Sequence, residues 1–180
     1  MAQSKVTVKA RLSFVHLFKP HAIVEGQTPK YSVALLIPKS DKVSVDKIKG
    51  AVEAAKANYL EKHPGAQIPA RPRSVVYDGD GVRESGEEFG PECKGCYVVN
   101  ASSLSKPVVV DIDKNPILDE QEVYSGCYGK AVINFYYYDT AGNKGISAGL
   151  NGIMKTADGE PLSASGVSDS DWDDEDEDFI

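Results

Sequence analysis

Alternating apolar and polar residues open the chain and predict a half-buried β-strand. Between positions 5 and 14, apolar side chains fill the even positions, while Lys, Thr, Arg and Ser fill the odd ones. A period of two places the two sets on opposite faces of a strand. The pattern therefore predicts a strand that buries Val6, Val8, Ala10, Leu12 and Phe14 and carries a basic outer face.

The next two segments predict a strand followed by a helix. Residues 31–37 form an almost continuous apolar run that ends at Pro38, which is typical of a strand covered on both faces. From Ser44, apolar residues recur at helical spacing to about residue 62, with Lys and Glu between them. Either Ser44 or Asp41 is suited to cap this helix, and His63-Pro64-Gly65 ends it.

The remainder alternates between loops and strands. Residues 64–73 are Pro-rich, and residues 78–92 are Gly-rich and acidic, so both are expected to be loops. Further strands are predicted at Tyr97–Ala101, Val108–Ile112, Gly129–Tyr138 and Gly145–Met154. Residues 139–143 supply a hairpin turn between the last two. This order predicts a mainly β (α+β) fold: a small antiparallel barrel with one inserted helix (about 44–62) and long loops.

Length and charge suggest one domain with an acidic tail. The 180 residues accommodate a domain at 1–166 followed by a tail at 167–180. Net charge is −7, yet residues 1–73 carry 13 Lys and Arg against 5 Asp and Glu. That basic segment is either a phosphate-binding surface or an ordinary solvated face. No apolar run suits a signal peptide or a membrane span, so a cytoplasmic protein is expected.

The tail combines many carboxylates with a few large apolar side chains. Residues 167–180 contain eight carboxylates and no basic residue, which predicts disorder. They also contain Trp172, the only Trp of the chain, and end in Phe179-Ile180. Such a peptide is suited either to dock into a basic, hydrophobic pocket of a partner or to lie in a basic groove of its own protein. The residues assigned to partner binding are Trp172, Asp173, Asp174, Glu175, Asp176, Glu177, Asp178 and Phe179.

No segment of the sequence carries a signature of catalysis or metal binding. Cys93 and Cys96 form a lone CxxC, and three Cys residues in a reducing compartment do not build a disulfide framework. The Asp-Gly repeat at 78–81 lacks the spacing of a calcium loop and is explained by turn formation. The carboxylates of 111–122 leave a metal-dependent nuclease as an alternative. We expect no enzyme activity, no cofactor and no metal.

Four consecutive aromatic residues at 135–138 suggest a ligand surface. On a strand they place two rings on each face, and only one face is required for the core. Exposed rings beside Lys and Arg hold single-stranded nucleic acids by stacking and by phosphate contact. Coverage of both faces is the alternative.

Several long segments resemble the family of bacteriophage single-stranded-DNA-binding proteins. They are KYSVALLIPKSD (30–41), YDGD (77–80), NASSLSKPVVVD (100–111) and the run from PILDEQEVYSGCYGKAVINFY through GEPLS (116–163). The resemblance implies an oligonucleotide-binding (OB) fold, a five-stranded barrel. It also implies non-catalytic coating of single-stranded DNA in phage replication and recombination, within the infected bacterial cell. The acidic tail is similar to tails that recruit phage or host replication proteins and compete with DNA.

The candidate DNA contacts follow from side-chain chemistry and position, not from the family. They are Lys5, Lys9, Arg11, Lys30, Tyr31, Arg71, Arg73, Tyr77, Lys106, Tyr124, Tyr128, Lys130, Tyr136 and Tyr138. A one-residue slip in the last predicted aromatic strand would replace Tyr136 and Tyr138 by Phe135 and Tyr137. Duplex DNA remains an alternative ligand. The rival function is a protein-interaction module that acts through the tail without nucleic acid.

Overall fold

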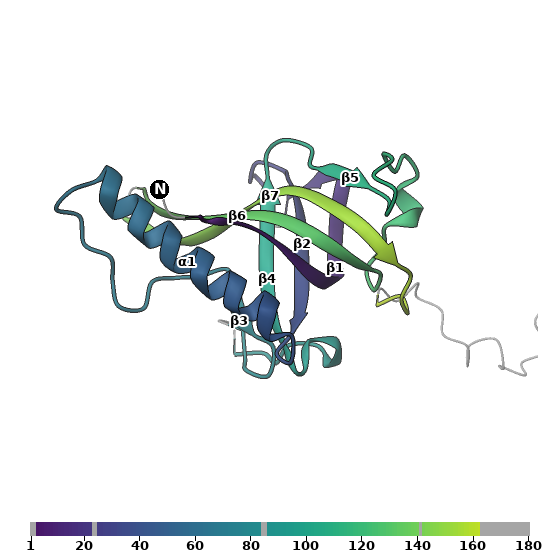
Figure 1. Ribbon diagram of the computed structural model, residues 1–180, viewed down its shortest axis with the longest axis horizontal. Coiled ribbons are helices and arrows are strands. Elements are labelled where there is room, and N and C mark those ends of the chain that lie inside the picture. The colour runs from purple at the N-terminus through teal and green to yellow at the C-terminus, as the bar shows by residue number, and fades with distance from the viewer. Residues whose placement is uncertain (1–2, 23–24, 84–85, 141, 163–180) are drawn as a thin grey trace, which may run out of the picture.

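Five strands close into a barrel in the computed structural model, which describes residues 3–22, 25–83, 86–140 and 142–162. Around the ring lie β1 (Lys5–His21), β2 (Lys30–Pro38), β4 (Cys96–Ser103), β7 (Asn143–Ala157) and β6 (Tyr128–Thr140) (Figure 1). Two short strands extend the sheet: β3 (Val76–Asp78) beside β4, and β5 (Val108–Val110) beside β7. Two single-turn helices, η1 (Pro91–Cys93) and η2 (Glu120–Glu122), lie in the loops.

The ring closes through one parallel pair of strands. Successive ring neighbours are antiparallel from β4 through β2, β1 and β6 to β7, and Ser102 of β4 then pairs in parallel with Gly149 of β7. A closed ring with an odd number of strands cannot alternate direction throughout, so at least one pair must be parallel. The predicted five-stranded barrel with one helix is confirmed, and its pairing is antiparallel everywhere around the ring except at this seam.

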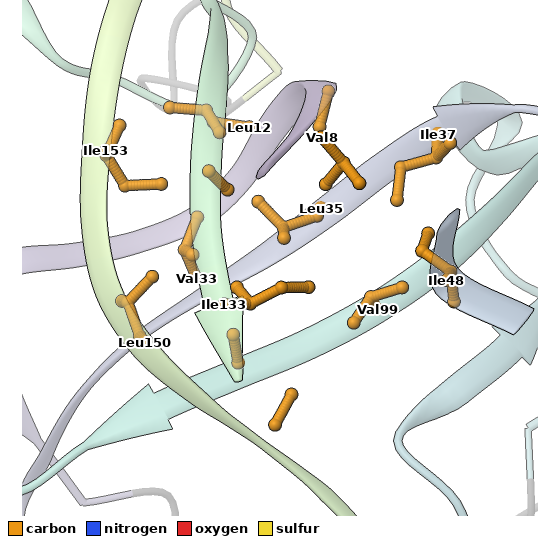
Figure 2. Packing of buried hydrophobic residues seen from close by; sticks show 14 of the residues in the cluster. Val8, Leu12, Val33, Leu35, Ile37, Ile48, Val99, Ile133, Leu150 and Ile153 are labelled. Carbon is orange, nitrogen blue, oxygen red and sulfur yellow. The ribbon is translucent and has the colours of Figure 1, made fainter. Parts of the chain in front are cut away.

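Alternate strand residues fill the barrel, and α1 (Lys42–Lys62) closes one end. Figure 2 shows Leu12, Leu35, Val99 and Ile133 pointing into this common core, with Ile48 reaching it from α1. The helix packs against β6 and β1. Asp41 is its N-cap, because its carboxylate accepts a hydrogen bond from the Ser44 amide at 3.2 Å. Among the described residues, no helix has the length and apolarity needed to cross a membrane.

The first strand breaks its alternation at Phe14. We expected this side chain in the core, but it is 61% exposed and its φ is 48°. The pairing of β1 with β2 shifts register between Ser13 and His16, which marks a β-bulge. An extra residue in one strand reverses which side chains face inward, so Leu17 is buried instead. A period-two reading cannot foresee such an insertion.

A loop at residues 79–95 covers half of the outer face of β2 and β4. Ala34 and Leu36 of β2 point out of the barrel and pack with Val98, Phe89 and Cys93 in a second small core. Both faces of this part of β2 are therefore buried, which explains its continuous apolar run. The loop leaves the other half of the β2–β4 face uncovered.

Lys39 fastens this loop through two carboxylates. Its Nζ lies 2.6 Å from Oδ1 of Asp78 and 2.7 Å from Oδ2 of Asp80. Asp80 in turn accepts the Gly95 amide at 3.0 Å. The hydrogen bond from Lys39 is the largest cause that holds the pKa of each carboxyl below its usual value, and a backbone hydrogen bond adds to it. The same contacts raise the pKa of Lys39.

We predict that Lys39→Met loosens the loop and raises the pKa of both carboxyls. Their depressed pKa values mean that the contact stabilises the fold above about pH 4 and ceases to do so as pH falls through the folded pKa. Hydrogen exchange of residues 79–95 at neutral pH should be faster in Lys39→Met than in the wild type. Lys42→Met, on the exposed start of α1, is the control and should leave this exchange unchanged. Equal exchange in wild type and Lys39→Met would show that the ion pairs do not hold the loop.

Candidate nucleic-acid interface

Strand β6 presents tyrosines alternately to the core and to solvent. Phe135 and Tyr137 are 1% and 5% exposed, and Tyr137 meets Tyr59 of α1 edge-to-face at 4.7 Å. Tyr136 is 45% exposed on the outer face, and Tyr138 is partly exposed there. The strand thus has the orientation that the sequence analysis chose. Contact of these rings with DNA stays a prediction.

Both rings lie beside glycines of the neighbouring strand, β7. Gly149 pairs with Asn134, and a Cβ placed on it would lie 4.0 Å from Cε1 of Tyr136. At Gly145 a Cβ would lie 2.8 Å from the carbonyl oxygen of Arg73 and 3.0 Å from the hydroxyl oxygen of Tyr138, so the close Arg73 backbone requires glycine here. Beside these glycines, Tyr136 remains 45% exposed and Tyr138 partly exposed.

Small polar side chains continue this surface across the seam. Ser102 of β4 pairs with Gly149 on one side and with Ser32 of β2 on the other. Asn100, two residues from Ser102 on the same face of β4, is exposed. We call this surface the seam face, and it comprises the outward side chains of Ser32, Asn100, Ser102, Asn134, Tyr136, Tyr138 and Ser147. It lies on the half of the β2–β4 face that the loop at 79–95 leaves open.

Cationic residues flank the seam face. Arg73 lies beside the start of β7, where its carbonyl accepts the Ile146 amide at 2.7 Å, and its side chain is exposed. Arg71 is exposed two residues earlier. Lys5 pairs with Asn134 across β1 and β6, and Lys30 opens β2. OB folds bind oligonucleotides on the face of their second and third strands, which here are β2 and β4.

At the bulged end of β1, the side chains of His16 and Phe14 lie next to the seam face. His16 pairs with Ser32 and stacks on His21 at 4.2 Å between ring centroids. Burial, and then the proximity of His21, lower the pKa of His16, which favours the neutral ring. The exposed ring of Phe14 lies two residues away.

A second group of predicted contacts lies elsewhere and has other partners. Arg11 donates to the carbonyls of Gly126 and Glu160 at 3.0 and 2.7 Å, and its guanidinium lies 5.6 Å from the centre of the Tyr128 ring. Eight residues separate Tyr128 from Tyr136, or about 26 Å of strand. Lys9 and Lys130 pair beside Arg11 and Tyr128. This group lies towards the far end of β6 from the seam face.

The other predicted residues are also spread apart. The Tyr124 hydroxyl donates to the Gly159 carbonyl at 2.9 Å, which fixes the end of the domain. Tyr77 packs near Phe89 beneath the loop, and Lys106 lies 5.6 Å from the centre of the Phe18 ring. Tyr31 is partly buried opposite Ser103. The residues of the tail lie outside the described residues.

Sequence reasoning missed the polar floor of the seam face. Ser32, Asn100 and Ser102 were not singled out, although alternate polar positions within two apolar strands mark outward faces. Phe14 and His16 were missed because the bulge hid their orientation.

Two carboxylates of the segment 111–122, Asp111 and Asp119, accept hydrogen bonds from backbone amides. Asp111 accepts the amides of Asp113 and Asn115, and Asp119 accepts the amide of Gln121, each at 2.9 Å. Within the described ranges, no three His, Cys, Asp or Glu side chains gather closely enough to hold a metal ion. Burial raises the pKa of the Cys93 and Cys96 thiols, which makes them poor nucleophiles.

One family model and one curated relative match most of the chain. The family model described as Enterobacter phage Enc34, ssDNA-binding protein, matches residues 3–180. The curated "Putative protein p50" of Acyrthosiphon pisum secondary endosymbiont phage 1 is 31% identical over 164 residues, which covers 88% of this chain and 85% of the relative.

Solved structures give the same picture. The single-stranded DNA-binding protein from bacteriophage Enc34, in complex with ssDNA, is 29% identical with a TM-score of 0.75, and the match covers 89% of this chain and 90% of that one. The gp2.5 single-stranded DNA-binding protein of bacteriophage T7 is 20% identical with a TM-score of 0.58, covering 95% and 94%. The second likeness concerns the fold alone.

Proposed function

The chain belongs to the family of the Enterobacter phage Enc34 ssDNA-binding protein, and from this premise we propose that it binds single-stranded DNA across the seam face without catalysing a reaction. The observation that carries the proposal is the pair of tyrosines, Tyr136 and Tyr138, that lean over glycines of β7 at the seam. Open ring faces stack on any base, because every base has a π-face. A relative with the same fold was solved in complex with ssDNA.

The surroundings of the two rings fit a sequence-tolerant site. The floor of Ser32, Ser102 and Gly149 is small and polar, so bases can approach the sheet closely. Arg73 and Lys30 flank this floor, where phosphates would pass. Affinity carried by such contacts falls with salt, with a log–log slope of about −0.7 for each phosphate neutralised on a single strand.

Coating of single strands during phage replication and recombination, in the cytoplasm of the infected host, is the role we assign to this binding. The turn-capping carboxylates of 111–122 favour a binding protein over a nuclease. Of the residues singled out in the sequence, Lys5, Lys30, Arg71, Arg73, Tyr136 and Tyr138 form the proposed binding surface. Lys9, Arg11, Tyr128 and Lys130 belong to a separate basic face.

We assign a regulatory role to residues 167–180. Their eight carboxylates and no basic residue favour a disordered segment that repels DNA and is attracted to basic surfaces. Trp172 and Phe179 supply apolar anchors for a partner, which we take to be a phage or host replication protein. The domain proper is then 1–166.

Tyr136→Ala is predicted to weaken binding of a single strand of about 30 nucleotides. Loss of one stacked base costs about 1–3 kcal/mol, which is roughly 5- to 150-fold in Kd. Fluorescence anisotropy of a labelled oligonucleotide at fixed salt measures this change.

Tyr128→Ala is the matched control, because Tyr128 is 44% exposed on the same strand and Tyr136 is 45% exposed. A larger loss for Tyr128→Ala would move the binding surface to the separate basic face. If the wild type shifts no oligonucleotide at low salt, the rival function, a protein-interaction module, takes precedence. Tighter binding to duplex than to single strands would also contradict the proposal.

A chain that ends at Gly166 is predicted to bind single strands more tightly than the full chain. The gain should be larger at low salt, because charges interact over only about 10 Å at 0.1 M. The control keeps the length but replaces residues 173–178 by Asn and Gln, and it should show most of the same gain. Weaker binding by the shortened chain would rule out competition between tail and DNA.

A further inference from the structure

A shallow apolar depression lies on the outer face of β5, β7 and β6. It has a volume of ≈ 250 Å³ and is bounded by Val108, Val110, Lys130, Val132, Ile153 and Met154. Val108 is 64% exposed at its rim. The depression adjoins the Asn134 end of the seam face, and Val132 lies four residues before Tyr136 on β6, or about 13 Å along the strand.

The position of β5 creates this depression. β5 pairs with β7 in parallel, with Val108 opposite Gly152 and Val110 opposite Met154. A Cβ at Gly152 would lie 3.2 Å from the Val108 carbonyl oxygen, so the missing side chain lets the two backbones approach. The valines of β5 then form one wall, and Val132 forms the opposite one. The exposed Val108 leaves apolar surface open beside the depression.

A basic row connects the depression with the end of the described chain. Arg11 holds the Glu160 carbonyl at 2.7 Å, and the Leu162 amide donates to Ser125 at 2.8 Å. From there Lys9, paired with Lys130 across β1 and β6, continues the row, and Lys130 lies at the rim of the depression. The chain therefore leaves the barrel at one end of a cationic row and meets apolar surface at the other.

The chain beyond Leu162 has the reach and the chemistry to follow this row. Thr7, which pairs with Val132, lies four residues from Arg11, or about 13 Å along β1. Trp172 follows Leu162 by ten residues, which span at most about 33–36 Å when extended. Asp169 and Asp171 precede Trp172, and six carboxylates follow it. An aromatic anchor within an acidic segment matches an apolar hollow beside lysines.

We propose that Trp172 docks its indole into this depression, with Asp169 and Asp171 beside Lys9 and Lys130. Residues 173–178 then extend along β6 towards the seam face, where their charge opposes DNA. The proposal rests on the regulatory role assigned to the tail and gives that tail a specific binding site on its own domain.

The fluorescence of Trp172 can report its own docking, because Trp172 is the only Trp of the chain. The experiment records the emission maximum and acrylamide quenching of the full-length protein at low salt without DNA, and compares them with a synthetic peptide of residues 163–180. Docking predicts a blue-shifted maximum and a smaller quenching constant in the protein. Val108→Glu, which places a charge of the tail's sign at the rim, should return both values to those of the peptide.

Val82→Glu is the matched control, because Val82 is 60% exposed in the loop at 79–95 and should leave the emission unchanged. Lys130→Gln should also shift the emission maximum towards that of the peptide. Here the cause is lost attraction between Lys130 and the carboxylates of the tail, whereas Val108→Glu repels them. Emission identical to that of the peptide, or unaffected by Val108→Glu, would overturn the proposal. So would a change of oligomeric mass in Val108→Glu with emission unchanged, because a second copy would then cover the depression. Since no DNA is present, failure here leaves the DNA-binding proposal standing.

Discussion

Closure of an odd-numbered ring of strands is the constraint on which the rest of the molecule depends. Five strands cannot all run antiparallel, so β4 and β7 meet in parallel, joined directly at Ser102 and Gly149. This seam brings the end of the β6–β7 hairpin beside β2 and β4. Tyr136 and Tyr138, from the second half of the chain, thereby share a surface with Ser32 from the first. The proposed binding surface is thus a product of ring closure rather than of any local motif.

The outer surface of the barrel has one part covered by a loop and two parts that stay open. The loop at 79–95, fastened by Lys39, buries Ala34 and Leu36 and removes half of the β2–β4 face from solvent. The seam face remains open because its floor is polar and offers no apolar contact to a covering loop. The depression beside β5 remains open although it is apolar. This difference in chemistry is what separates a surface suited to nucleic acid from one suited to a hydrophobic anchor.

Local patterns predicted the elements well, and for a physical reason. Alternation and apolar runs reflect burial, and burial decides which residues form strands, so β1, β2, β4, β6 and β7 were all foreseen. The same period placed two of the four aromatic residues at 135–138 on each face, but only the structure shows that Tyr136 is one of the outward pair. Three-residue β3 was missed, because so short a strand carries no period. Phe14 was assigned to the core because a bulge inserts one residue without a sequence signal.

Residue type alone did not separate candidate DNA contacts from residues that hold the fold together. Arg11 and Tyr124 resemble binding residues in the sequence, yet their partners, Glu160 and Gly159, lie far along the chain. No local pattern discloses such contacts. The family resemblance supplied the fold and the class of ligand, and the comparisons confirmed the family. The serines of the seam face could be found only after the strands had been placed side by side.

Photo-crosslinking of the wild-type protein to an iodouracil-substituted single strand tests the central claim most directly. Crosslinks form at aromatic rings that stack on the substituted base, and mass spectrometry of the peptides locates them. The structure predicts crosslinks within β6 at Tyr136 and Tyr138, on the seam face. Crosslinks confined to Tyr124 and Tyr128, at the far end of β6, would contradict it.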